Sequence, residues 1–250
     1  MLPQNLQQQS NGNKMKILVL ADIHGNKSAL EAILEKEEYD AVLCLGDLVD
    51  YGPEPRSVIK IIRQISTYTI MGNHDLSLAY SKGCVGCTEF FEKITLASRN
   101  NINYRFTEEE LDYLKKLPDK ILVELDGINI LMVHGTIKKP YEGYITPSTP
   151  SHIIEEEMHY EGNKKIDLIL FGHSHIPMDY QLHDYRIINP GSVGFPRGGD
   201  PRASYVVIEN GKIHFRKVKY NVEETIIGLK NMNLPQDIFD YLSTLLKRGE

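Results

Sequence analysis

Short apolar runs that each end in a polar motif constrain the fold of this chain more than any other feature. Residues 16–21 and 41–45 are continuous apolar runs, which are typical of strands buried on both faces. Apolar residues at helical spacing lie between them, and a further helix from about residue 56 to 65 precedes a third strand at 67–70. Strands that alternate with helices in this way predict a parallel sheet with helical crossovers.

The rest of the chain has a different pattern, because predicted strands there are joined by tight turns. Asp-Gly and Asn-Gly dipeptides between apolar runs are typical of antiparallel hairpins. Two such hairpins are predicted, one at 120–125 and 128–133 and the other at 203–209 and 212–218. Further helices are predicted by capping and apolar spacing: two within 88–116, one near 151–160, and two at about 222–230 and 238–247.

The chain ends and the cysteines limit the class of protein. The first fourteen residues are rich in Gln and Asn and lack the apolar run of a signal peptide, so we expect a disordered extension over 1–14 and one domain over 15–250. Within that domain, the polar stretch 136–165 is a candidate insertion or lid. An odd set of three cysteines argues against a disulfide framework and indicates a reducing cytoplasm. Because Cys84 and Cys87 lack a second pair, we interpret them as loop cysteines that bind no metal.

Polar motifs follow the predicted strands at the points where the apolar runs stop. Because the carboxyl ends of strands in an open α/β sheet open onto a shared crevice, we expect these side chains to converge there. Mixed carboxylate and imidazole ligands suit divalent first-row metals, and a set this large suits two ions about 3.5–4 Å apart. The motifs are Asp22-Ile-His24, Gly46-Asp47, Gly72-Asn73-His74-Asp75, His134-Gly135 and Gly172-His173-Ser-His175.

In their order and spacing, these five blocks resemble the calcineurin-like metallophosphoesterase superfamily, in its small bacterial and archaeal phosphodiesterase-like branch. The resemblance extends from residue 15 to about 218, and the segments 189–192 and 196–205 are similar to the closing signature of that branch. It implies an α/β fold, a four-layer αββα sandwich of two mixed β-sheets flanked by helices. That architecture agrees with the parallel and antiparallel strand patterns described above.

The resemblance also implies a role for each residue of the motifs. Two divalent ions would share Asp47 as a bridge, and manganese is the ion expected first, with Fe, Ni, Zn or Mg as alternatives. His74 would be the general acid and Asp75 would orient it. The remaining implied ligands are Asp22, His24 and His175 for one ion and Asn73, His134 and His173 for the other.

We therefore expect a cytoplasmic, metal-dependent phosphoric ester hydrolase that acts through a metal-bridging hydroxide. Its substrates would be small phosphodiesters, phosphomonoesters or nucleotide polyphosphates. Arginine suits phosphate, although it also forms structural salt bridges. Two alternatives stay open: a nuclease for single strands or oligonucleotides, and a non-catalytic scaffold that binds protein. The candidates for contacting substrate are Arg197, Arg202, Tyr51 and Arg56.

Charge and departures from related branches narrow the expected partners. A formal net charge of −6 gives no general attraction to phosphate backbones or anionic membranes, so neither duplex nucleic acid nor a membrane is expected as a partner. Met71 stands where the Ser/Thr protein phosphatase branch carries Arg, which disfavours protein dephosphorylation. The short chain after Val218 disfavours the extra domain of the DNA-processing branch. The oligomeric state and the preferred ester are not predicted.

Overall fold

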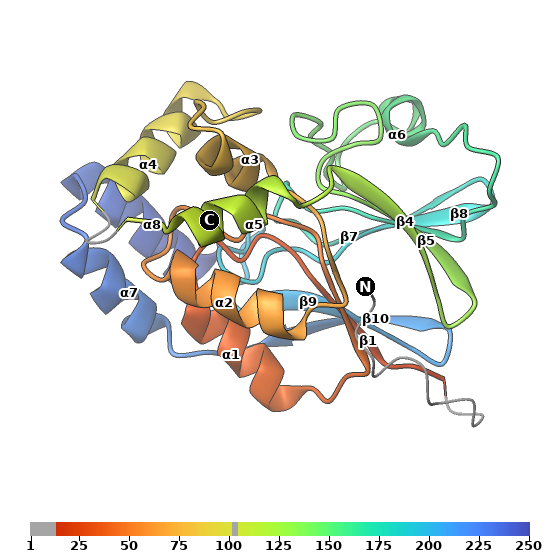
Figure 1. Cartoon of the computed structure of the whole chain (residues 1–250), viewed down its shortest axis with the longest axis horizontal. Coiled ribbons are helices and arrows are strands. Elements are labelled where there is room, and N and C mark those ends of the chain that lie inside the picture. The colour runs from red at the N-terminus through yellow and green to blue at the C-terminus, as the bar shows by residue number, and fades with distance from the viewer. Residues whose placement is uncertain (1–13, 102–104) are drawn as a thin grey trace.

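The computed structural model describes residues 14–101 and 105–250 of the chain (Figure 1). The predicted N-terminal extension, apart from Lys14, lies outside the described residues. None of the helices in the described ranges has the length and apolar character needed to cross a membrane. The helices are α1 (Lys27–Lys36), α2 (Pro55–Ile65), α3 (Asn73–Ala79), α4 (Glu89–Asn100), α5 (Glu108–Lys115), α6 (Ser151–Met158), α7 (Val222–Asn231) and α8 (Gln236–Arg248).

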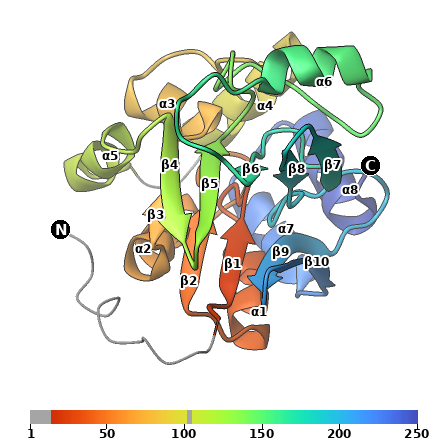
Figure 2. The ribbon, with the colours of Figure 1, turned by 90° about the vertical axis from the view of Figure 1, so that its right-hand side faces the viewer.

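In the described part of the chain, ten strands form two sheets of five strands each (Figure 2). The first sheet contains β1 (Ile17–Leu20), β2 (Ala41–Cys44), β3 (Tyr68–Thr69), β9 (Ala203–Glu209) and β10 (Lys212–Val218). The second contains β4 (Lys120–Leu125), β5 (Ile128–Val133), β6 (Leu168–Leu170), β7 (Met178–Leu182) and β8 (Tyr185–Asn189). Their orders are β10-β9-β1-β2-β3 and β4-β5-β6-β8-β7.

Each sheet has three adjacent parallel strands, and its other two strands are joined by antiparallel pairing. In the first sheet β1 pairs parallel with β2 and β2 with β3, whereas β9 pairs antiparallel with β1 and β10 pairs antiparallel with β9. In the second, β6 lies parallel to β5 and to β8, whereas β4 and β7 are antiparallel. The carboxyl ends of three strands therefore lie together at one edge of each sheet.

The alternating side chains of β1 show how the layers stack. Leu18 and Leu20 belong to a core that includes Leu30 of α1, whereas Ile17 and Val19 belong to a second core that includes Met132 of β5. Because successive side chains of a strand point to opposite faces, the first sheet has helices on one face and the second sheet on the other. A third core joins the outer face of the second sheet to α6. This arrangement confirms the predicted αββα sandwich.

Three elements, two strands and a short helix, were not predicted from the sequence. The hairpin of β7 and β8 turns at His183 and Asp184 and has no Asn-Gly or Asp-Gly pair, so it lacks the strongest hairpin signal. His183 takes a left-handed backbone conformation, with φ of +49°, where glycine would be expected. The short helix α3 begins inside the Gly72-Asn73-His74-Asp75 motif, and its first turn is occupied by polar residues rather than by an apolar stripe.

The core between the sheets provides a test of this architecture. Leu43 of β2 is fully buried there, so Leu43→Ala should lower the free energy of unfolding by about 2–5 kcal/mol. Ile227→Ala on α7 is the control, because that side chain is 59% exposed and its loss should change stability by less than about 0.5 kcal/mol. Chemical denaturation of both variants measures the difference, and equal effects would contradict the two-sheet core.

Candidate metal centre

The seven predicted ligand side chains follow the carboxyl ends of strands in both sheets, and they lie together in one buried cluster. Ligand atoms of Asp22, His24 and His175 lie within 4.8 Å of one another, and so do those of Asp47, His134 and His173. Asn73 joins the second group, since its Oδ1 lies 3.0 Å from His134 Nε2. A hydrogen bond from the His173 backbone N–H to Asp22 Oδ1 (3.1 Å) ties the second sheet to the first.

Asp47 lies between the two groups. Its Oδ2 is 3.5 Å from His24 Nε2 in one group and 3.2 Å from His134 Nε2 in the other. Its Oδ1 accepts a hydrogen bond from the His74 backbone N–H (2.9 Å), which fixes the carboxylate plane. This is the position that a carboxylate bridging two ions would occupy.

Three of the imidazoles are held so that their Nε2 atoms point into the cluster. Each Nδ1 lies within hydrogen-bond distance of a backbone carbonyl, which accepts from an Nδ1–H, so that Nε2 is the nitrogen left to bind a cation. Two such Nε2 atoms, those of His24 and His175, are 3.2 Å apart and cannot hydrogen-bond to each other when both are acceptors. A shared cation satisfies both. The carbonyl contacts are His24 to Val49 (2.9 Å), His134 to Leu45 (2.7 Å) and His175 to Phe195 (2.7 Å).

Burial keeps most of the cluster uncharged in the absence of a cation. It lowers the pKa of His24 and of His173 to about 3 and that of His175 well below its ordinary value, because a buried imidazolium loses its hydration. It also raises the pKa of Asp22 to about 7. Asp22 Oδ2 is buried and has no hydrogen-bond partner among the described residues. An orphaned carboxylate oxygen beside neutral imidazoles fits a divalent cation.

His134 and Asp47 behave as an ion pair. Burial alone would lower the pKa of His134, but the adjacent Asp47 carboxylate outweighs it and raises that pKa to about 9. Burial opposes the ionisation of Asp47, and the charge of His134 nevertheless holds the Asp47 pKa well below its usual range. A cation bound here therefore takes the place of the His134 proton.

The backbone of the cluster is held in conformations that most residues avoid. Seven residues other than glycine in and beside the cluster have left-handed backbones, with φ between +47° and +68°. Asp and His tolerate this region better than most residues, but each instance still costs on the order of 1–3 kcal/mol. These turns direct polar side chains into the cluster from the ends of the strands. The residues are Asp22, His24, Asp47, Asp50, Tyr51, His173 and His175.

The predicted acid His74 is oriented by a different carboxylate from the one expected. Its Nδ1 lies 2.8 Å from Asp50 Oδ2, and Arg99 of α4 holds both oxygens of Asp50 at 2.7 and 2.6 Å. Although burial opposes ionisation of Asp50, the Arg99 guanidinium lowers its pKa. The only sequence signal for Asp50 was its place three residues after Asp47 in the same loop.

Asp75 was expected to orient His74, and this expectation is wrong. Both Asp75 oxygens accept backbone N–H groups instead, from Asp47 (2.7 Å), Leu48 (2.9 Å) and Gly72 (3.0 Å). Asp75 thus supports the loop that carries Asp47. The loop packs tightly, because a Cβ at Gly72 would overlap the Asp47 carboxylate.

A pocket of about 360 Å³ opens beside the cluster. It contains two of the four predicted substrate-contact residues, Tyr51 and Arg197. The Tyr51 hydroxyl is 3.3 Å from His74 Nε2, and the Arg197 guanidinium lies 4.6 Å from the Phe91 ring centre and 3.3 Å from the Tyr144 hydroxyl. The lining residues are Asp47, Tyr51, His74, Gly86, Cys87, Thr88, Phe91, Tyr144, His173, His175 and Arg197.

The other two predicted substrate contacts, Arg56 and Arg202, lie elsewhere. Arg56 is paired with Glu110 at 2.7 and 2.9 Å and lines a separate surface hollow between α2 and α5. Arg202 is exposed and is paired with Asp200 at 2.7 and 3.0 Å. Both were candidates for contacting substrate, and both form the structural salt bridges that arginine also favours.

The two cysteines that we interpreted as loop residues without a metal are joined to each other, which was not predicted. Cys84 and Cys87 form a disulfide, whereas Cys44 is free and buried in the first sheet. An odd number of cysteines argues only against a framework of several disulfides. It does not exclude a single disulfide between two cysteines that are three residues apart. The loop between α3 and α4 places this pair beside the cluster.

Comparisons with known proteins identify a family and several similar proteins. The family model described as a calcineurin-like phosphoesterase superfamily domain matches residues 15–212. An uncharacterised protein of Methanocaldococcus jannaschii is 29% identical over 245 residues, covering 89% of this chain and 95% of that one. A phosphodiesterase of Escherichia coli is 25% identical over 202 residues, covering 78% and 88%. The crystal structure of a metallophosphoesterase from Sphaerobacter thermophilus has a TM-score of 0.77 at 27% identity, covering 95% and 100%.

The supporting role of Asp75 can be tested by stability. Asp75→Ala leaves three buried N–H groups without an acceptor, so it should lower the free energy of unfolding of the metal-free chain by at least about 2 kcal/mol. Asp112→Ala, which removes an exposed carboxylate on α5, should have an effect below about 1 kcal/mol. Urea denaturation measures both free energies of unfolding. An Asp75→Ala variant as stable as the wild type would contradict the supporting role of Asp75.

The protonated state of the cluster predicts that metal uptake releases protons. With a pKa of about 9, His134 carries a proton at about pH 7.5 and must lose it to a cation. Mn²⁺ affinity should therefore rise as the pH increases toward 9, with roughly one proton released per chain at about pH 7.5. Calorimetric titration in buffers of different ionisation enthalpy counts the protons. Their absence, or the same count in His134→Asn, would contradict this assignment.

Proposed function

Because the chain belongs to the calcineurin-like phosphoesterase superfamily, we propose that it is a phosphoric ester hydrolase that uses two divalent metal ions on small phosphorylated substrates. The observation that carries the proposal is the Asp47 carboxylate between two groups of inward-facing imidazole Nε2 atoms, beside the orphaned Asp22 oxygen. The name of the Escherichia coli relative, a phosphodiesterase, supports the same class of reaction.

The chain's own residues divide into two ion sites that share Asp47. Asp22, His24 and His175 would hold one ion, and Asn73, His134 and His173 the other. When bound, such ions neutralise phosphate charge and lower the pKa of a bound water toward neutrality. The mixture of carboxylate, amide and imidazole donors suits Mn²⁺. We propose the cytoplasm as the location.

His74 and Arg197 would act on the substrate from the pocket. The His74 Nδ1–H donates to Asp50, so Nε2 is the nitrogen available to give a proton to the leaving oxygen. Arg197 has a buried Nε with no hydrogen-bond partner among the described residues, and this donor suits a phosphate oxygen. Phe91 and Tyr144 wall the same pocket, and Tyr144 comes from the segment 136–165, which we propose as the substrate-contacting insertion.

Activity of the metal-loaded chain tests the proposal. The Mn²⁺-loaded protein should hydrolyse bis(p-nitrophenyl) phosphate and lose that activity with chelator or with Asp47→Ala. His74→Asn should lower kcat about 10²–10⁴-fold for alkyl esters, whose leaving oxygen needs a proton, and far less for p-nitrophenyl esters. His152→Asn, on the exposed face of α6, is the matched control and should change neither rate. Metal-replete protein that is inert toward a broad panel of phosphoesters would refute the proposal.

A further inference from the structure

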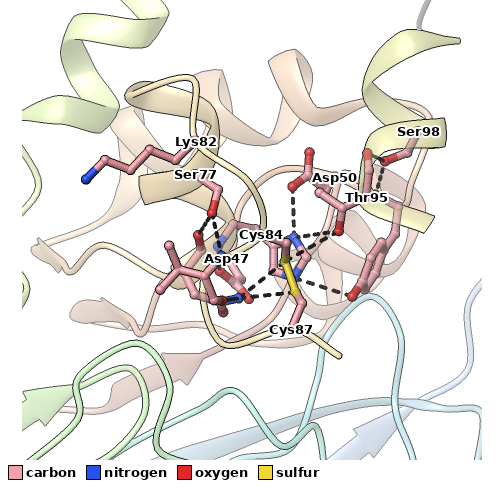
Figure 3. Close-up of a disulfide and its surroundings, with 12 residues drawn as sticks. Asp47, Asp50, Ser77, Lys82, Cys84, Cys87, Thr95 and Ser98 are labelled. Atoms are coloured by element: carbon pink, nitrogen blue, oxygen red, sulfur yellow. Dashed lines mark hydrogen bonds and ion pairs between the residues drawn. A yellow bond between two sulfur atoms is a disulfide. The ribbon is translucent and has the colours of Figure 1, made fainter. Parts of the chain in front are cut away.

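The disulfide between Cys84 and Cys87 lies directly against the proposed catalytic machinery (Figure 3). Cys84 Sγ is 3.8 Å and Cys87 Sγ is 3.9 Å from His74 Nε2. Both sulfur atoms are also 3.8 Å from Nδ2 of the metal-ligand candidate Asn73. No part of the proposed reaction uses these sulfur atoms, although they touch the nitrogen that would donate its proton.

The two sulfur atoms and His74 Nε2 have the composition and spacing of a thiolate metal site. Zinc bonds of about 2.3 Å to sulfur and 2.0–2.1 Å to nitrogen place tetrahedral S and N ligands about 3.6 Å apart. The Cys84 and Cys87 distances to His74 Nε2 exceed that separation by only a few tenths of an ångström. The C-x-x-C spacing is itself common for paired zinc ligands.

The surroundings of His74 suit a metal-binding imidazole. Metal-ligating histidines usually donate their other ring N–H to a carboxylate, and His74 Nδ1 is 2.8 Å from Asp50. Arg99 holds Asp50 in place, and Nε2 faces both cysteines as well as the Tyr51 hydroxyl, which lies 3.3 Å from it. Cys87 and His74 both line the pocket, which leaves a fourth coordination position open toward it.

We infer that the reduced chain has an additional site for a thiophilic divalent ion such as Zn²⁺, formed by Cys84, Cys87 and His74 Nε2, and that the disulfide abolishes this site. A low-molecular-weight thiol opens the site: two RSH molecules reduce the disulfide to two protein thiols and leave as RSSR. Zn²⁺ then binds both sulfur atoms and Nε2, and two thiol protons are released.

The bound ion would withdraw His74 from proton transfer, because its coordinated Nε2 can no longer carry a proton. This consequence rests on the proposed function, whereas binding of the ion does not. Zn²⁺ should therefore inhibit the reduced enzyme and spare the oxidised one. The loss should be about 10²–10⁴-fold for alkyl esters and small for p-nitrophenyl esters, the selectivity expected when a general acid is removed.

Spectroscopy of the full chain tests the site without reference to activity. With the main cluster already loaded with Mn²⁺, Co²⁺ added to the anaerobic reduced protein should give a sulfur-to-cobalt charge-transfer band that one equivalent of Zn²⁺ abolishes. The oxidised protein should show no such band. The double variant Cys84→Ser/Cys87→Ser should also lack it although it keeps Cys44, and His74→Asn should bind Co²⁺ at least about tenfold more weakly.

The outcomes separate this inference from the proposed function. Reduced wild-type protein without the band, or a band that persists in the double serine variant, overturns the site. If the variants fail to fold, the comparison of reduced with oxidised wild-type protein decides alone. A band in protein that is inert on every phosphoester supports the site and refutes the proposed function. Active enzyme without the band refutes the site and leaves the proposed function standing.

Discussion

The centre depends on one kind of interaction, the contact between an imidazole Nδ1 and a backbone carbonyl. His24, His134 and His175 each make one, with Val49, Leu45 and Phe195. Because these carbonyls belong to strand ends and to the loops that follow them, the sheets fix the orientation of the three imidazole rings. The Nε2 atoms of His24 and His175 therefore lie 3.2 Å apart in the cluster. Rotation of any ring would break a buried hydrogen bond, which keeps the ligands preorganised.

The sandwich supplies what this interaction needs. Each sheet contributes three parallel strands, so both present several carboxyl ends at one edge, and the buried core between the sheets fixes the two edges relative to each other. Asp75 extends the same order into the loops by holding the N–H groups around Asp47. Arg99 of α4 holds Asp50, and Asp50 in turn orients the imidazole of His74.

The fold and the convergence of the ligands could be predicted because both follow from strand ends. Continuous apolar runs marked β1 and β2, Asp-Gly and Asn-Gly marked two hairpins, and the polar motifs began where those runs stopped. The partner of His74 could not be chosen in this way. Asp75 is its neighbour in the sequence, whereas Asp50 lies 24 residues away and reaches the ring only because the loop after β2 takes a left-handed turn. The positions of Arg56 and Arg202 could not be predicted for a related reason. Arginine binds phosphate and carboxylate alike, and in the structure Arg56 pairs with Glu110 and Arg202 with Asp200.

The left-handed residues of the cluster affect the stability of the metal-free protein. A glycine at Asp22 or His173 would adopt the same backbone with less strain, so the chain retains these side chains despite a penalty to its own folding. In the metal-free protein, backbone strain is therefore concentrated at the carboxyl ends of the strands, where the cluster lies. Selection for heat resistance alone would tend to erase these residues first, and a thermostable homologue that retained them would have to gain its stability from the outer helices or the sheet core.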